Sequence, residues 1–221
     1  MPELTISPTA TPSEGVWQAM LATPGFMPED EALALYRAAL TGARMGPVLE
    51  VGTYCGRSTL LLAEATRREG TLTVTVDHHR GSEEHQPGEG FHDPDLVDPV
   101  SGRVDTLPRF RRAVADAGLE EHVVAVVAPS TSAARVWALP LGMVFVDGGH
   151  SEQAAQRDYE GWSPHVAPGG LLAIHDVFED PADGGRPPYN IYRRALDSGG
   201  FVERAATGSL RVLERVQAPV A

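Results

Sequence analysis

Lysine is absent from this chain of 221 residues, so all 18 of its basic side chains are arginine, and they stand against 30 acidic side chains. The formal net charge is therefore −12 at pH 7. A protein that binds nucleic acid usually presents a basic stripe that neutralises phosphates, and no long run of arginine supplies one here. An anionic membrane surface is disfavoured for the same reason. We expect neither nucleic acid nor a membrane as a partner.

Cysteine and long apolar runs are also scarce. The single Cys55 excludes an internal disulfide and a cysteine-rich zinc site, and it fits a reducing compartment. No run is apolar over the length that a bilayer requires, and residues 1–15 contain neither the basic nor the apolar part of a signal peptide. We therefore expect a cytoplasmic protein. Hydrophobic residues make up 42% of the chain, close to the average of globular domains, so a packed core is feasible.

The rest of the chain alternates short apolar segments with amphipathic ones. We predict an N-terminal arm and helix over residues 1–46 and one domain over 47–221, the arm being loose up to Ser13. The predicted strands are 47–51, 71–76, 123–127, 143–146, 170–174, 200–203 and 210–213. The predicted helices are 30–43, 58–69, 107–117, 151–161 and 189–197. This alternation predicts an α/β fold with a mainly parallel sheet covered on both faces. The last two strands follow too closely for a crossover helix, so they should form an antiparallel hairpin.

Residues 78–106 interrupt this alternation. They are rich in glycine, proline, acidic residues and histidine, and they are longer than an ordinary loop between a strand and a helix. Two interpretations remain open, a functional lid or interface loop and a merely mobile segment.

The first candidate for chemistry is a glycine-rich loop that follows the first predicted strand. An open α/β sheet binds its ligands beyond the carboxyl ends of its strands. Gly52 and Gly56 let the backbone approach a ligand there, and the next helix offers free N–H groups. A dinucleotide fingerprint would need glycine where Tyr54 stands, so NAD binding is disfavoured. A tight turn without a ligand is the alternative.

The second candidate is Asp77, at the end of the second predicted strand. A carboxylate in this place can accept hydrogen bonds from the two hydroxyls of a ribose. Asp77 follows Gly52 by about 25 residues, close to the spacing of a ribose-binding carboxylate. A surface turn is the structural alternative, but the neighbouring glycine loop favours the ribose.

The third candidate is a pair of strand ends that both carry aspartate and histidine. Asp147 and His150 follow one apolar strand, and His175 and Asp176 follow another. Two carboxylates and an imidazole in one pocket would suit a divalent cation. Such a cation could acidify a substrate hydroxyl, and His150 could take its proton. In the alternative interpretation the aspartates cap the following segments and the histidines are structural.

Taken together, these motifs resemble the class I S-adenosylmethionine-dependent methyltransferases. The similarity rests on Glu50-x-Gly52-x-x-x-Gly56, the acidic end of the second strand, the segment from Val146 to Trp162, and Pro168-Gly-Gly-Leu-Leu-Ala-Ile-His-Asp176. It is closer to the small-molecule and sugar O-methyltransferases related to the macrolide and cephamycin enzymes. It extends from about residue 47 to the C-terminus, and it implies a Rossmann-like fold with a seven-stranded sheet and a reversed terminal hairpin.

The resemblance also implies roles for individual residues. The cofactor-binding residues that it implies for S-adenosylmethionine are Glu50, Gly52, Tyr54, Gly56, Ser58, Asp77, Ser130 and Asp147. Among these, Asp77 would hold the ribose and Ser130 would lie near the adenine. A magnesium ion (Mg2+) would be held by Asp147, His175 and Asp176, although His175 stands where the family usually has a carboxylate. His150 stands where a catalytic base is expected.

We accordingly expect transfer of a methyl group from S-adenosylmethionine to a sugar hydroxyl, with a small molecule or an oligosaccharide as acceptor. Residues 78–85 are similar to actinobacterial enzymes, including those that methylate the 1-hydroxyl of mannosides for methylmannose polysaccharides. The alternatives are methylation of a non-sugar natural product such as a macrolide or a catechol, a metal-dependent hydrolase, and a binding protein that keeps the cofactor pocket without activity. We also expect a homo-oligomer, a dimer, in which the N-terminal arm could complete a neighbour's site.

Overall fold

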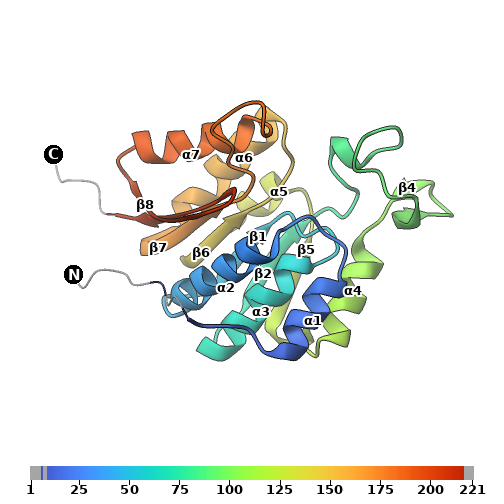
Figure 1. Ribbon diagram of the computed structural model, residues 1–221, viewed down its shortest axis with the longest axis horizontal. Helices are drawn as coiled ribbons and strands as arrows, with labels where there is room; N and C mark the ends of the chain where they lie inside the picture. Colours follow the sequence, from blue (N-terminus) through green and yellow to red (C-terminus); the bar gives the residue numbers. More distant parts are fainter. Residues whose placement is uncertain (1–5, 7–8, 217–221) are drawn as a thin grey trace.

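The computed structural model describes residues 6 and 9–216, and a seven-stranded sheet with the order β5-β2-β1-β6-β7-β9-β8 forms its centre (Figure 1). The parallel strands are β1 (Val48–Val51), β2 (Thr73–Asp77), β5 (Val123–Val127), β6 (Leu141–Val146) and β7 (Val166–Ile174). The antiparallel hairpin consists of β8 (Phe201–Thr207) and β9 (Leu210–Arg215). The predicted α/β fold with its seven strands and reversed hairpin is confirmed.

Helices cover both faces of this sheet (Figure 1). One face carries α1 (Glu14–Ala22), α2 (Glu29–Ala43), α3 (Arg57–Glu69) and α4 (Leu107–Asp116), and the other carries α5 (Ser130–Ala134), α6 (Glu152–Trp162) and α7 (Pro187–Asp197). Four short 3₁₀ turns are η1 (Glu83–His85), η2 (Pro94–Leu96), η3 (Glu120–His122) and η4 (Ser163–His165). Helices α1 and α5 were not predicted from the sequence. The apolar signal in α1 is short, since only Val16 and Met20 are buried.

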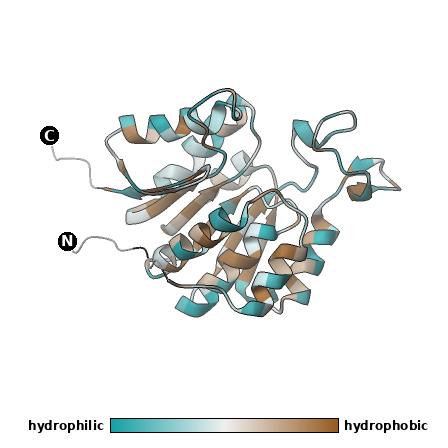
Figure 2. Ribbon diagram, viewed as in Figure 1, coloured by the Kyte–Doolittle hydropathy of each residue, from teal (hydrophilic) through white to brown (hydrophobic). Residues whose placement is uncertain are grey.

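Alternating side chains of the strands divide the core into two layers. In β1, Val48 packs with α2 and α3, whereas Leu49 and Val51 pack with α6 and α7. Figure 2 shows the apolar character of the central strands and of the neighbouring helices. Glu50 faces the same layer as Val48, because side chains two residues apart along a strand share a face. It is therefore a charged residue built into the core side of the sheet.

Helix α2 approaches the sheet unusually closely through two glycines. A Cβ atom on Gly142 would clash with the carbonyl oxygen of Gly42, and a Cβ on Gly42 would lie 2.6 Å from the Cβ of Met143. Gly42 is at the end of α2 and Gly142 is near the start of β6, so the helix runs antiparallel to the strand. The first turn of α2 consequently lies at the carboxyl edge of the sheet.

The described part of the N-terminal arm lies against the helices. Arg37 Nε donates to the carbonyl oxygen of Ala10 at 3.0 Å, and Arg68 Nη1 donates to that of Thr11 at 2.9 Å. The rest of the predicted loose arm, residues 1–5 and 7–8, lies outside the described residues. Among the helices of the described chain, none combines the length and the apolar character needed to cross a bilayer.

The long segment between β2 and α4 is folded. It contains η1, η2 and a second, two-stranded sheet of β3 (Val97–Asp98) and β4 (Arg103–Val104). Buried Leu96 and Val104 form a small core with Cys55, which belongs to the glycine loop. In Figure 1 this segment extends beyond the edge of the sheet near the label β4. Packing against Cys55 makes the segment an ordered part of the molecule.

The two ends of this segment are also joined to each other. The N–H of Thr106 donates to the carbonyl oxygen of His79 at 3.2 Å, and His79 Nδ1 lies 2.7 Å from Thr106 Oγ1. Arg80 and Asp105 form an ion pair one residue further in, at 3.4 Å. Because both ends are fixed at the same place, the segment forms a closed loop with its own packing.

The contact between α2 and β6 gives a stability prediction. We expect Gly142→Ala to destabilise the protein by about 1–3 kcal/mol, since the new methyl group would push α2 away from the sheet. Thermal unfolding followed by circular dichroism measures this loss. Gly15→Ala is the matched control, because a Cβ on Gly15 meets nothing within 4 Å and alanine favours a helix. Equal melting temperatures for the two variants would refute the close approach.

Candidate functional site

The carboxyl ends of three strands carry residues in the left-handed backbone region. Tyr54 follows β1, His79 follows β2 and Asp176 follows β7, with φ angles of 50°, 57° and 57°. Such conformations cost a non-glycine residue about 1–3 kcal/mol and gather at functional sites. Two of these residues, Tyr54 and Asp176, were predicted as site residues from the sequence. The unusual backbone therefore coincides with the edge that the motifs indicate.

The glycine loop after β1 makes a tight turn against the loop after β6. Gly52 has a φ of 88°, and a Cβ there would clash with the carbonyl oxygen of Asp147. Gly56, with a φ of 94°, caps α3, and its N–H donates to the carbonyl oxygen of Thr53 at 2.8 Å. The N-terminus of α3 is thus held at the edge of the sheet, where its free N–H groups favour a negatively charged or polar ligand.

Glu50 holds this loop in place from the buried side. Its side chain is completely buried and accepts hydrogen bonds from Ser58 Oγ at 2.5 Å, Thr59 Oγ1 at 2.6 Å and Thr75 Oγ1 at 2.6 Å. Burial raises the pKa of Glu50 to about 7, although the three hydroxyls favour its carboxylate form. Glu50 and Ser58, both predicted to bind the cofactor, are therefore bonded to each other and shape the start of α3.

Asp77 closes the same loop from the side of β2. Its Oδ2 accepts from the N–H groups of Thr53 at 2.8 Å and Tyr54 at 2.9 Å, and its Oδ1 accepts from the N–H of His79 at 2.7 Å. A carboxylate offers roughly four acceptor positions. Three are filled by backbone N–H groups, so Asp77 joins the glycine loop to the end of β2, and about one acceptor position is left.

His175 lies buried among three carboxylates that come from different parts of the chain. Its Nε2 is 2.6 Å from Glu31 Oε2, and its Nδ1 is 3.0 Å from Asp147 Oδ1 and 3.4 Å from Asp176 Oδ2. Burial alone would lower the pKa of His175, but Asp147, Asp176 and Glu31 together raise it to about 12. Each ring nitrogen of His175 faces a carboxylate oxygen, and since a carboxylate only accepts, both nitrogens carry protons and donate them.

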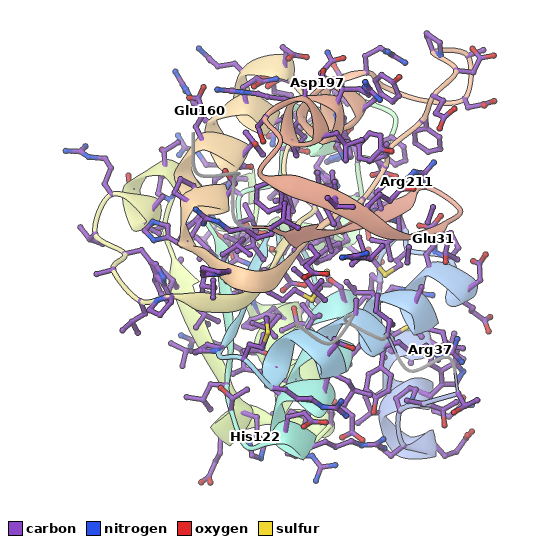
Figure 3. All side chains as sticks on the ribbon, turned by 90° about the vertical axis from the view of Figure 1, so that its left-hand side faces the viewer. Glu31, Arg37, His122, Glu160, Asp197 and Arg211 are labelled. Carbon is purple, nitrogen blue, oxygen red and sulfur yellow. The ribbon has the colours of Figure 1, made fainter. Side chains whose placement is uncertain are left out.

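Glu31 is the partner that the sequence analysis missed. It lies in the first turn of α2 and also accepts from the N–H of Ser209 at 2.6 Å and from Ser209 Oγ at 3.1 Å. Figure 3 labels Glu31 beside the hairpin that carries Arg211. Acidic residues are common in the first turn of a helix, so Glu31 carried no signal that distinguished it from Glu29 and Asp30.

The predicted metal site can be tested on its donor set. Ligand atoms of Asp147, His175 and Asp176 lie within 4.8 Å of one another. Two carboxylates suit a magnesium ion, which prefers oxygen ligands. A doubly protonated imidazole offers no lone pair to a metal. The carboxylates of Asp147 and Asp176 therefore fit a divalent cation, whereas His175 holds both of them by hydrogen bonds.

His150 bridges two acidic side chains at the open side of this cluster. Its Nε2 is 3.0 Å from Asp176 Oδ2, and its Nδ1 is 3.0 Å from Glu84 Oε1. These hydrogen bonds raise the pKa of His150 to about 10 against the effect of burial. The pKa of Asp176 lies well below its usual range, because His150 and His175 outweigh the burial that opposes its ionisation. Glu84, in turn 83–85 of the long segment, had not been predicted.

Ser130 and the residues near Asp158 lie on the α5–α6 side of this cluster. Ser130 Oγ accepts from Trp162 Nε1 at 2.8 Å, and burial raises the pKa of Asp158 to about 6. A cavity of about 10 Å³, enough for about one water molecule, is lined by residues that include Asp147, His150, Asp158 and His175. Asp147, His150 and His175 therefore line one small cavity, as expected from the sequence. The hydroxyl of Ser130 instead forms a hydrogen bond with α6.

Comparison with solved structures identifies the class of fold. An O-methyltransferase from Bacillus cereus in complex with SAH is 14% identical, with 96% of this chain and 95% of that chain covered and a TM-score of 0.64. The O-methyltransferase TomG from Streptomyces achromogenes, involved in tomaymycin synthesis and solved with SAM, is 16% identical, with coverages of 95% and 93% and a TM-score of 0.63. The SAH-bound methyltransferase PaMTH1 of Podospora anserina is 13% identical, with coverages of 93% and 88% and a TM-score of 0.62. The fold is that of methyltransferases.

The family itself follows from the sequence match. The family model described as "Methyltransferase domain" matches residues 49–177, which is more than half of the chain. The chain therefore belongs to this methyltransferase family. The matched residues include the glycine loop, Asp77, Asp147, His150 and His175. Membership favours a methyltransferase over the metal-dependent hydrolase that the sequence analysis had kept as an alternative.

The buried Glu50 gives a prediction about pH. Its folded pKa of about 7 lies above the ordinary glutamate value of 4.5, so its contribution to folding stability is most favourable below pH 4.5 and is lost as the pH rises through about 7. We expect Glu50→Gln to remove that loss, about 1–3 kcal/mol between pH 5 and pH 8. Urea unfolding of the cofactor-free wild type and variant at both pH values measures it. An identical pH dependence in the two proteins would contradict the burial of a titrating Glu50.

Proposed function

We propose that the protein is an S-adenosylmethionine-dependent O-methyltransferase that acts on a neutral, hydroxylated small molecule, specifically on a sugar hydroxyl. The observation that carries the proposal is the position of His150. Its imidazole bridges Glu84 and Asp176 next to Asp147, and Asp147 touches the glycine loop through Gly52. A histidine that can take part in proton transfer therefore lies beside the loop that would hold the cofactor.

The cofactor would bind at the carboxyl edge, across the ends of β1, β2 and β6. The N-terminus of α3 and the turn at Gly52 leave room for the backbone to approach it, and Asp77 has one acceptor position for its ribose. The residues that we propose for S-adenosylmethionine are Glu50, Gly52, Tyr54, Gly56, Ser58, Asp77, Ser130 and Asp147. Among them, Glu50 and Ser58 act by shaping the loop. SAM and SAH in the structures of TomG and the Bacillus enzyme support this cofactor.

The reaction is a displacement at the sulfonium methyl group. The acceptor oxygen forms a bond to the methyl carbon, the carbon–sulfur bond breaks, and S-adenosylhomocysteine leaves with the electron pair on sulfur. With a pKa raised to about 10, His150 first releases its own proton to solvent, and its neutral form then accepts the proton of the hydroxyl. Glu84 and Asp176 stabilise the imidazolium that this transfer creates, as the carboxylate of a catalytic triad does. Holding both reactants in line supplies much of the remaining rate enhancement.

Asp147 and Asp176 are the residues that would hold a magnesium ion in this reaction. When bound, the ion would supply Lewis acidity that stabilises the acceptor oxyanion. His175, held by Glu31, keeps both carboxylates in place from the buried side. Because His175 uses both nitrogens as donors, we assign it this positioning role in place of direct ligation.

The charge around the site favours an uncharged acceptor. Four carboxylates, those of Glu31, Glu84, Asp147 and Asp176, face the imidazoliums of His150 and His175, and a bound magnesium ion would balance the remaining charge. The site then has no surplus positive charge for a phosphate or a carboxylate on the acceptor. A sugar has many hydroxyls and no charge, which fits the expectation of a mannoside 1-hydroxyl. Neutral non-sugar natural products such as a macrolide or a catechol remain the runner-up class.

We also propose that the protein forms a homodimer. Strand β5 lies at one edge of the sheet and is rich in valine, and its Val124 and Val127 are exposed. An apolar edge strand is prone to pair with another chain. This proposal places the second copy along β5.

Methyl transfer from radiolabelled S-adenosylmethionine to a panel of glycosides and catechols tests the activity. We expect His150→Ala to lower kcat by about 10²–10⁴, the range of a lost general base, while calorimetry shows unchanged SAH binding. His122→Ala is the control, because His122 belongs to turn η3 just before β5, at the amino ends of the strands, whereas His150 follows the carboxyl end of β6. Full activity of His150→Ala would refute the assigned base.

Removal of divalent cations tests the metal separately. We expect EDTA to abolish transfer, magnesium to restore it, and Asp147→Asn to raise the magnesium concentration needed for half-maximal rate by at least about tenfold. The measurement is the initial rate at increasing magnesium. A rate that is insensitive to EDTA would refute the metal while leaving the role of His150 in place.

A further inference from the structure

Four aromatic rings from three distant parts of the chain form a continuous surface, which we call the aromatic shelf. Its members are Phe26, Tyr54, His85 and Phe91. Phe26 comes from the connection between α1 and α2, Tyr54 from the glycine loop, and His85 and Phe91 from the long segment. Neighbouring ring centroids are 4.9–6.1 Å apart, for example 4.9 Å between Tyr54 and His85 and 5.1 Å between Phe26 and Phe91.

The shelf is open to solvent although it is made of aromatic side chains. Phe26 is 59% exposed and Phe91 is 50% exposed, while Tyr54 and His85 are partly buried beneath them. Exposed aromatic clusters are uncommon on a chain with only 6% aromatic residues. Apolar patches of this kind mark binding surfaces. The packing of the core does not require these two phenylalanines.

One member of the shelf, His85, is the neighbour in sequence of Glu84, which contacts His150. Glu84 and His85 are adjacent in turn η1, so their Cα atoms are about 3.8 Å apart. The side chain of Glu84 contacts His150, and the ring of His85 stacks on Tyr54 at an interplanar angle of 24°. A ligand of the size of one or two sugar rings could therefore lie on the shelf and present a hydroxyl to His150.

We propose that the aromatic shelf is the acceptor subsite and that it stacks against the apolar face of a neutral pyranose ring. This inference rests on the proposed O-methyltransferase function and extends it to the class of acceptor. Exposed Phe26 and Phe91 provide the stacking surface, and Glu84 provides a hydrogen-bond acceptor for ring hydroxyls at its edge.

The arrangement of the rings favours a pyranose over a flat aromatic acceptor. The two exposed rings, Phe26 and Phe91, meet edge to face at 73°, so they form no slot between parallel rings into which a flat acceptor could slide. The shelf thus offers one splayed surface with carboxylates at its edge. A pyranose presents C–H bonds on one face and hydroxyls around its rim, which matches a surface of this kind.

The experiment uses wild type and the variants Phe26→Ala and Phe91→Ala, each saturated with SAH or supplied with S-adenosylmethionine. Calorimetry measures binding of a reducing mannose disaccharide and of catechol, and initial rates give kcat and KM. We expect each variant to weaken disaccharide binding and to raise its KM by about three- to tenfold, the range for a lost aromatic contact, with kcat within twofold. SAH binding should be unchanged, because Tyr54 and the glycine loop are left intact.

Val100→Ala is the matched control. Val100 lies in the same long segment, is 94% exposed and is outside the shelf, so its truncation should leave binding and KM unchanged. Saturation-transfer NMR adds a geometric readout. Protons on one face of the pyranose should receive magnetisation from the protein in wild type and lose it in Phe26→Ala.

The outcomes separate the two proposals. Absence of disaccharide binding to wild type, or unchanged binding in both phenylalanine variants, would overturn the shelf. If the phenylalanine variants lose catechol binding and no form of the protein binds the disaccharide, the pyranose acceptor is refuted. The proposed O-methyl transfer would still stand in that case. If the disaccharide binds on the shelf but no hydroxyl of any acceptor is methylated, the shelf is supported and the proposed function fails.

Discussion

The buried imidazolium of His175 is the interaction on which the site depends. Its proton donors join Glu31 of α2, Asp147 after β6 and Asp176 after β7, and Glu31 in turn holds Ser209 of the β8–β9 turn. A buried charge is tolerated only when it is paired and fully hydrogen-bonded. Removing His175 would leave the buried carboxylates without a compensating positive charge. The first helix turn, two strand ends and the terminal hairpin are therefore fixed together, and the geometry around His150 follows from that arrangement.

A steric constraint complements this electrostatic one. The clash that any side chain at Gly52 would make with Asp147 shows that the glycine loop and the acidic cluster share a boundary. Glu50 holds that loop by accepting hydrogen bonds from side-chain hydroxyls, and Asp77 holds it by accepting from backbone N–H groups. The glycine loop and the acidic cluster therefore cannot move independently of each other.

The fold was largely predictable because its signals are local. Alternation of apolar strands with helices, and the glycines that end them, predicted β1 and α3 nearly residue by residue. It located the hairpin, although β8 runs four residues and β9 two residues beyond the predicted ends. That Asp147, His150 and Asp176 lie close together was predictable, because their motifs follow the ends of neighbouring strands. Glu31 and Glu84 could not be predicted, since they reach His175 and His150 across 144 and 66 positions and sit among similar acidic residues. The long segment was left undecided because its packing against Cys55 is a tertiary contact.

The joined ends of the long segment have a consequence for how such proteins can diversify. His79 and Thr106 are hydrogen-bonded to each other, so the segment between them leaves the sheet and returns to it at the same place. Sequence within that insert can change in length and composition while β2 and α4 stay where they are, because closing a longer loop costs little additional free energy. His85 and Phe91 belong to the insert, whereas Gly52 and Asp77 belong to the sheet. Evolution could therefore replace the surface formed by this insert while the sheet and its glycine loop stay unchanged.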